Sequence, residues 1–197
     1  MNIVNELLHK LSFRIRQIIY QRKLNSCIAN GLKLGNNVTI MPGAFIDPRY
    51  SYLISIGDNC SLSNGVVIVA HDAATFKFTN GYTRLGKVDI KENCYIGTNA
   101  IILPGVTIGP NVLIAAGSVV NKSIPPNSCV AGVPARIYSK FDEFISHHTE
   151  MINSRPSFDY KEFNSPNNEF KKRIIEMLEE DAIYVKGFNG KFPWTKT

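Results

Sequence analysis

His71 is the residue whose type and position in this chain most clearly suggest chemistry. It lies in the stretch VVIVAHDAATFKF, where a regular six-residue repeat stops. The other histidines, His9, His147 and His148, lie outside the repeat. An imidazole has a pKa of about 6.5, so it can take a proton from a reacting hydroxyl at neutral pH. His71 is therefore the candidate general base.

The repeat around His71 has a fixed period of six. From Leu34 it reads LGNNVT, IMPGAF and IDPRYS, and after four further residues IGDNCS, LSNGVV and IVAHDA. The frame returns at Ile90 as IKENCY, IGTNAI, ILPGVT, IGPNVL and IAAGSV. The first position is aliphatic and the fifth is mostly small or apolar, so both should point inward. The fourth is asparagine or glycine in most units, and these residues adopt positive φ most readily, which predicts a corner.

Short extended stretches joined by corners predict a chain wound as a coil with flat faces. Repeats of this kind are typical of a parallel β-helix, in which each turn stacks on the previous one. An amphipathic helix would need a period near 3.6, and Pro104 and Pro110 would interrupt it. We therefore expect an all-β fold over residues 34–137 with one protruding loop, 72–87. Because histidine tolerates positive φ, a purely conformational role for His71 at a corner is the alternative.

Helical patterns flank the repeat. In the N-terminal segment 1–33, apolar residues at helical spacing predict a helix over residues 3–23. In the C-terminal segment 138–197, FDEFISHHTEMI predicts a short helix, and NNEFKKRIIEMLEEDAIYV predicts another after Pro166. A basic amphipathic helix such as the first can lie on a membrane, but it more often packs on its own protein. We therefore expect accessory helices and no firm membrane association.

Composition narrows the class of protein. The chain has 197 residues and 44% hydrophobic content, enough for one domain with terminal additions. It shows no long apolar run and no signal-peptide core, so we expect a cytoplasmic protein whose four cysteines are reduced. The formal net charge of +6 would suit a polyanion. Aromatic residues are not interleaved with the basic ones, so we expect a nucleotide-bearing small molecule and no nucleic acid.

The segment GVTIGPNVLIAAGSVVNKSIPPNSCVAGVPARI, together with the repeat and His71, carries a resemblance to a known family. The chain resembles the hexapeptide-repeat acyltransferases, in the branch of the maltose, galactoside and polysaccharide O-acetyltransferases and the xenobiotic acetyltransferases. The match covers residues 34–137 and is most specific from Ile96 to Arg136. It implies a left-handed parallel β-helix, acetyl-CoA as the acetyl donor and a homotrimer with active sites at the subunit interfaces.

The resemblance also implies roles for individual residues. His71 corresponds to the catalytic base of the family. Gly97 and Thr98 match the segment near the thioester, where an amide or hydroxyl can stabilise a developing oxyanion. The stretch that lines the pantetheine and adenine of the donor is matched by Ala116, Asn121 and Lys122.

The phosphate end of the donor is matched in part. Arg136 corresponds to a basic residue that meets a CoA phosphate, which a guanidinium binds well. A second basic residue is expected three positions later, where this chain has Ser139 with Lys140 beside it.

The acceptor side is matched less closely. Asp47 and Asn64 are the polar candidates for acceptor contacts, and Asp72 could bind the acceptor or cap the loop. Asp72 is a poor candidate for orienting His71, because adjacent residues of an extended chain point in opposite directions. Aromatic residues in the loop 73–87 could shape an acceptor pocket or pack on a neighbouring copy.

These observations favour one function and leave others open. The favoured function is an acetyl-CoA-dependent O-acetyltransferase that acts on a hydroxyl of a sugar or polysaccharide precursor by direct transfer. The alternatives are acetylation of an amino sugar, antibiotic or amino acid, and a catalytically inactive structural β-helix. A β-helical zinc enzyme of the carbonic anhydrase type needs three converging histidines, whereas the repeat supplies one, so we expect no metal.

Overall fold

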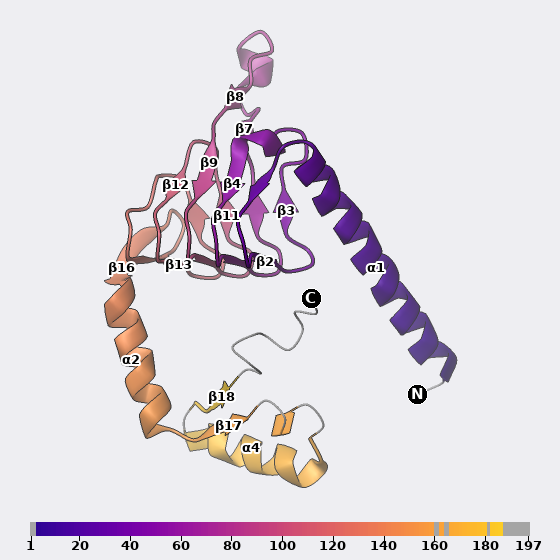
Figure 1. Ribbon diagram of the computed structural model, residues 1–197, viewed down its shortest axis with the longest axis vertical. Helices are drawn as coiled ribbons and strands as arrows, with labels where there is room; N and C mark the ends of the chain where they lie inside the picture. The colour runs from indigo at the N-terminus through magenta and orange to yellow at the C-terminus, as the bar shows by residue number, and fades with distance from the viewer. Residues whose placement is uncertain (1–2, 160–161, 164–165, 181, 187–197) are drawn as a thin grey trace. The chain divides into compact units, whose positions relative to one another are not determined.

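The computed structural model describes residues 3–159, 162–163, 166–180 and 182–186. The chain forms two compact units, Met1–Phe141 and Asp142–Thr197, which are described separately. The first unit contains the repeat and a long N-terminal α-helix, and the second contains the other long α-helices (Figure 1).

Most of the short strands in the first unit form three sheets. The β1 sheet contains, in order, β1 (Lys33–Leu34), β4 (Ile54–Ile56), β9 (Val88–Ile90) and β12 (Thr107–Ile108). The β2 sheet contains β16 (Arg136–Lys140), β15 (Ser128–Ala131), β13 (Val112–Ile114), β10 (Tyr95–Ile96), β5 (Ser61–Leu62) and β2 (Thr39–Ile40). The β3 sheet contains β14 (Val119–Val120), β11 (Ile101–Ile102), β6 (Val67–Ile68) and β3 (Phe45–Ile46). Within these three sheets every pairing is parallel except that of β15 with β16, so the predicted parallel β-helix is confirmed.

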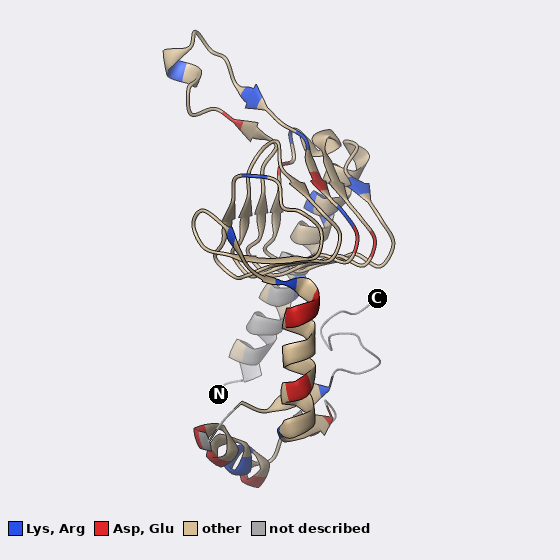
Figure 2. Cartoon of the chain, turned by 90° about the vertical axis from the view of Figure 1, so that its left-hand side faces the viewer, with Lys and Arg blue, Asp and Glu red and all other residues tan. Residues whose placement is uncertain are grey.

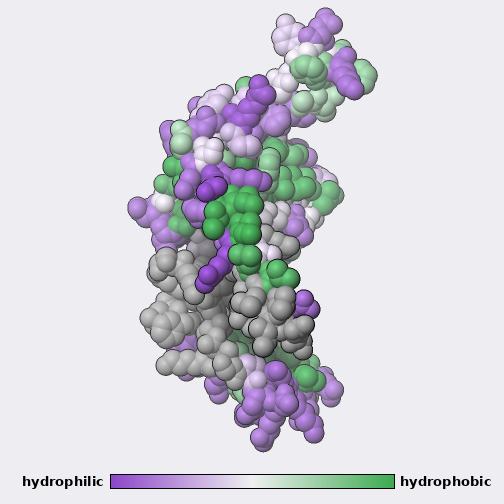
Figure 3. All heavy atoms as spheres, turned by 90° about the vertical axis from the view of Figure 1, so that its right-hand side faces the viewer, coloured by the Kyte–Doolittle hydropathy of each residue, from purple (hydrophilic) through white to green (hydrophobic). Residues whose placement is uncertain are grey.

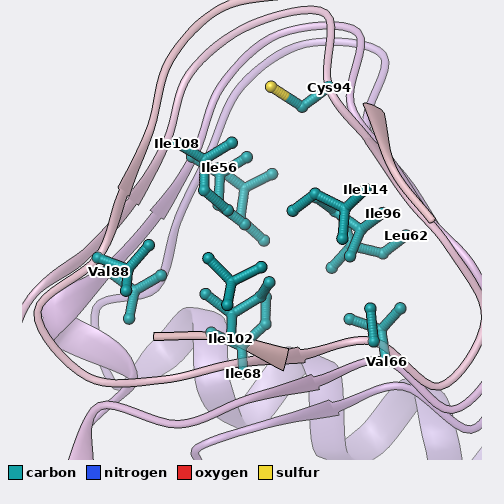
Figure 4. Packing of buried hydrophobic residues seen from close by; sticks show 14 of the residues in the cluster. Ile56, Leu62, Val66, Ile68, Val88, Cys94, Ile96, Ile102, Ile108 and Ile114 are labelled. Carbon is teal, nitrogen blue, oxygen red and sulfur yellow. The ribbon is translucent and has the colours of Figure 1, made fainter. Parts of the chain in front are cut away.

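The first position of the repeat fills the interior of the coil. Figure 4 shows these aliphatic side chains stacked inside the roughly triangular cross-section. Ile68 and Ile102 are paired on adjacent strands, and both are 0% exposed. Burial of one such side chain stabilises the fold by about 1.5–3 kcal/mol, so the ladder is a main source of stability.

The fourth position of the repeat forms the corners. All nine asparagines and glycines at this position have positive φ, which confirms the prediction: Asn37, Gly43, Asn59, Gly65, Asn93, Asn99, Gly105, Asn111 and Gly117. Between the β1 and β2 sheets the corner residues are all asparagines, and some of their amides bond along the stack. Asn93 Nδ2 donates to Asn111 Oδ1 at 3.1 Å, and Asn111 Nδ2 donates to Asn127 Oδ1 at 2.8 Å.

A hairpin interrupts the stacking register. Residues stacked in adjacent turns are normally 18 apart, as Ile101 and Val119 are, but Val67 and Ile101 are 34 apart. The inserted residues form an antiparallel pair, β7 (His71–Asp72) and β8 (Arg84–Leu85), with a 3₁₀ turn, η2 (Phe76–Phe78), between them. Figure 2 shows this hairpin projecting from the coil, with an acidic position in β7 and basic positions in η2 and β8.

Helix α1 (Ile3–Ala29) is longer than the predicted helix 3–23. Its C-terminal part contacts the coil, where Cys27 is buried and Leu24 packs against the core. Ser51 Oγ, in the 3₁₀ turn η1 (Ser51–Leu53), donates to the Cys27 carbonyl at 3.1 Å. The helix end is thus fixed to the turn that follows β3.

The second unit holds both predicted C-terminal helices, α2 (Phe141–Ser154) and α4 (Asn168–Glu180). Strands β17 (Ser157–Asp159) and β18 (Tyr184–Lys186) pair in parallel. Phe158 is buried, and its ring meets that of Phe170 edge to face at 6.0 Å. Among the described residues, none of the helices has both the length and the apolar composition needed to cross a bilayer.

Candidate active site

The predicted site residues other than Arg136 lie on two edges of the coil. The histidine edge follows the β3 sheet and comprises residues 47–53, 69–87, 103–106 and 121–123. The glycine edge precedes the β3 sheet and comprises residues 41–44, 63–66, 97–100 and 115–118. The β3 sheet therefore separates the two edges.

Asp47 meets His71 on the histidine edge. The Asp47 backbone amide donates to the Ile68 carbonyl at 2.9 Å, which stacks Asp47 beside the residues that lead to His71. The Asp47 carboxylate lies 2.5 Å from His71 Nδ1 and accepts the Ala70 amide at 3.1 Å. Asp47 is 1% exposed, whereas the His71 side chain is 36% exposed. A buried carboxylate thus holds the inner side of a solvent-accessible imidazole.

This contact determines which ring nitrogen is basic. Burial raises the pKa of Asp47, but hydrogen bonds from His71, the Ala70 amide and the Tyr50 amide outweigh it, so the pKa lies below its usual value. An ionised carboxylate only accepts hydrogen bonds, so Nδ1 must carry the hydrogen. In the neutral ring Nε2 then has the free lone pair. His71 can therefore act as a base through Nε2.

The backbone at His71 differs from the sequence expectation. His71 is extended in β7, where it pairs with Leu85, and it is absent from the positive-φ residues of the described chain. The prediction of a corner at this position, and with it the purely conformational alternative, is wrong. The physical reason is that the chain leaves the coil here and needs an extended residue to begin the hairpin.

Tyr50 and Arg84 extend the histidine edge, and sequence reasoning missed both. The Tyr50 ring centroid lies 5.1 Å from that of His71, with the planes tilted by 49°. The Arg84 guanidinium lies over the turn at Gly105, where it would be 3.3 Å from a side chain added to that glycine. The position of Tyr50, three residues after Asp47, is the sequence feature that could have indicated it. No sequence feature indicates Arg84, because its position depends on how β7 pairs with β8.

The predicted acceptor residues are placed differently from one another. The sequence predicts that Asp47 contacts an acceptor. In the structure Asp47 is buried against His71, and its carboxylate bonds the imidazole ring instead of facing an acceptor. Asp72 caps the loop by accepting the Ala74 amide at 2.8 Å, which was one of its two expected roles. Asn64 is exposed on the glycine edge.

Gly97 packs directly against the next turn of the coil. Its amide donates to the Ile114 carbonyl at 2.8 Å, so that amide is already engaged and is a poor oxyanion donor. A side chain at Gly97 would come within 2.6 Å of the Ala116 nitrogen. Gly97 therefore serves close packing, and the exposed hydroxyl of Thr98 is the remaining candidate donor at this turn.

The other donor residues divide between the edges. Ala116 is exposed on the glycine edge, and a side chain added to the neighbouring Gly117 would meet nothing within 4 Å. Arg136 is exposed opposite Ala131, one turn beyond Ala116. Asn121 and Lys122 are exposed on the histidine edge, directly after β14. One chain therefore presents the candidate base on one edge and half of the predicted donor-binding residues, Gly97, Thr98 and Ala116, on the other.

The repeat region matches known proteins. Residues 87–122 match the bacterial transferase hexapeptide family (six repeats), and residues 54–70 match the hexapeptide repeat of succinyl-transferase. The galactoside O-acetyltransferase of Escherichia coli strain K12 is 37% identical over 99 residues, 49% of this chain and 49% of the relative. A solved hexapeptide-repeat acetyltransferase of Vibrio cholerae has a TM-score of 0.51 at 23% identity and covers 71% of this chain and 94% of its own.

These matches define the class of the coil. It is a left-handed parallel β-helix of hexapeptide repeats, as the resemblance implied. The predicted resemblance to the hexapeptide-repeat acyltransferases is confirmed. The chain spans about half the length of the E. coli relative that it matches.

The buried Asp47 carboxylate makes the free energy of unfolding depend on pH in the acidic range. Because its pKa is lower in the folded chain, the unfolded chain binds more protons below about pH 3.9, and the contribution of Asp47 is lost as pH falls through the folded value. We expect Asp47→Asn to lower the free energy of unfolding at neutral pH. The difference from wild type should narrow below about pH 4 in urea titrations followed by circular dichroism. A difference that stays constant on acidification would contradict this role.

Proposed function

We propose that the chain is an acetyl-CoA-dependent O-acetyltransferase in which His71 is the general base for a hydroxyl of a sugar or polysaccharide precursor. The observation that carries this proposal is the hydrogen bond between Asp47 and His71 Nδ1, which leaves Nε2 as a base on a partly exposed ring. An inactive structural β-helix has no need for a buried carboxylate that orients an exposed imidazole.

The proposed reaction uses this geometry. His71 Nε2 takes the proton of the acceptor hydroxyl as its oxygen attacks the thioester carbonyl carbon, and Asp47 stabilises the imidazolium that forms. The carbon–sulfur bond breaks, and the thiolate of CoA takes the proton from Nε2. The exposed hydroxyl of Thr98 is the proposed donor to the developing oxyanion.

The glycine edge suits the elongated donor. Ala116 and Gly117 keep side chains short beside an open surface, which leaves room for the pantetheine arm. Arg136 lies at the end of this edge, where its guanidinium would pair with a phosphate of CoA. Asn121 and Lys122 would reach the donor from the histidine edge of a neighbouring copy.

A homotrimer would complete the site. The outward positions of the β3 sheet form an entirely apolar ladder: Phe45, Val67, Ile101 and Val119. The matching positions of the β1 sheet are polar, as with Ser55, which bonds Asp89 at 2.8 Å. Three copies that bury this ladder in a closed ring would bring the histidine edge of each copy beside the glycine edge of the next. The site would then lie between two copies.

Thiol release from acetyl-CoA tests the activity. On the best acceptor from a panel of sugars, amino sugars, antibiotics and amino acids, we expect His71→Ala to lower kcat by roughly 10²–10⁴-fold. Asp47→Asn should also lower kcat and change the pH–rate profile, because the ring loses its fixed tautomer. Asp72→Asn is the control and should remain near wild type. Turnover by His71→Ala at the wild-type rate, or no heat of acetyl-CoA binding in calorimetry, would contradict the proposal.

Mixed assemblies test the shared site. Ala116→Trp should block the glycine edge without disturbing the core, because Ala116 is exposed. Neither this variant nor His71→Ala should be active alone, whereas co-refolded mixtures should regain about a quarter of the wild-type interfaces. A mixture of His71→Ala with Asp47→Asn alters one edge only and should show no such gain. Equal behaviour of the two mixtures would place the whole site within one copy.

A further inference from the structure

Helix α1 carries two apolar faces. Tyr20, Leu24 and Cys27 form the face that meets the coil, where Tyr20 Oη donates to the Ile40 carbonyl at 3.3 Å. A second set of apolar residues lies about 150° around the axis, at 100° per residue. It is formed by Leu8, Leu11, Ile15, Ile18 and Ile19, called here the outer stripe. The expected packing of this helix on its own protein is confirmed for the first face only.

The outer stripe is exposed in the first unit. Its five side chains are between 47% and 58% exposed. Figure 3 looks onto this side of the molecule and shows apolar side chains gathered in a column with hydrophilic ones beside them. The stripe is about 17 Å long at 1.5 Å per residue. Single exposed apolar residues are ordinary, but a contiguous stripe of this kind indicates an interaction surface.

The charges of α1 indicate the kind of partner. The helix contains five lysines and arginines but a single acidic residue, Glu6. Arg14 lies beside one margin of the outer stripe and Lys23 beside the other, each about 40° from the nearest stripe residue. Arg22 continues the line of the stripe one turn further on. All three side chains are exposed.

This pattern selects among possible occupants. A second copy of α1 packed on the stripe would bring cations against cations with almost no acid to pair with them, which is unfavourable. An anionic lipid surface accepts both features: the apolar side chains enter the acyl boundary, and the flanking cations reach the phosphates. We propose that α1 docks on an anionic membrane surface and lies in its plane. This role is independent of the proposed acetyl transfer.

Vesicle flotation of the 197-residue chain tests the proposal. We expect the protein to float with vesicles of phosphatidylcholine and phosphatidylglycerol and to stay unbound with phosphatidylcholine alone. Ile15→Gln combined with Ile18→Gln should abolish flotation. Arg14→Gln combined with Lys23→Gln should weaken binding roughly fivefold for each removed cation, and added salt should weaken it further.

Matched substitutions on α4 provide the controls. Ile175→Gln with Leu178→Gln, and Lys171→Gln with Lys172→Gln, change exposed residues of the same types and should leave flotation unchanged. Circular dichroism of every variant checks that the helices are retained. Absence of flotation with anionic vesicles, or equal losses in the α1 and α4 variants, would overturn the proposal. A stripe variant that floats normally but has a lower assembly mass would also overturn it, in favour of an interface between copies.

Discussion

Stacking of successive turns of the coil in a fixed register is the constraint on which the rest of this structure depends. Each turn is bonded to the next through parallel strands, and one aliphatic residue stacks on another at each first position. The register leaves no freedom to slide, because a shift of one residue would turn the aliphatic ladder outward. Residues far apart in sequence are thereby held at fixed separations. The rigid coil can position a catalytic group with little help from long side chains.

The pairing of Asp47 with His71 is a direct product of that register. Ile46 stacks on Ile68, so the residues that follow each of them meet at the same edge. A buried acid and a partly exposed imidazole are thus brought together across 24 positions of sequence. Backbone amides from Ala70 and Tyr50 share the charge of the carboxylate, so the acid can remain ionised although it is buried. The ring is held on its Nδ1 side and open on its Nε2 side.

The same geometry explains why one chain presents the proposed site in two halves. Corners before and after the β3 sheet cannot meet within one coil, since the width of that sheet separates them. The apolar outer ladder of the β3 sheet lies between the two halves. Burial of this ladder and completion of the site are therefore the same event in the proposed trimer. The stability of the assembly and its activity should be linked for that reason.

Local features of the fold were predictable from sequence, and long-range partners were not. The inward aliphatic residues and the positive-φ corners follow from a period of six and from the conformational freedom of glycine and asparagine, both of which are local properties. The sequence predicts an acceptor contact for Asp47 instead of a bond to His71. The four extra residues before Ile56 change the spacing between residues stacked in adjacent turns, so the sequence does not show that Asp47 lies beside His71. The sequence likewise predicts that the Gly97 amide is free to stabilise an oxyanion. That amide instead donates to Ile114 in the next turn of the coil, a long-range contact that the sequence does not reveal. The prediction of a corner at His71 is wrong because the hairpin begins at this residue, which is therefore extended.

The protonation of the two ring nitrogens of His71 tests the central claim most directly. Nitrogen-15 NMR of the histidine rings reports which nitrogen carries the hydrogen. The signals of His71 are those that are missing from the spectrum of the His71→Ala variant. The structure predicts that the neutral ring has hydrogen on Nδ1 and a bare Nε2, and that Asp47→Asn weakens this preference. A neutral ring with hydrogen on Nε2 and a bare Nδ1 would contradict the account, because the exposed nitrogen would then have no lone pair to act as the base.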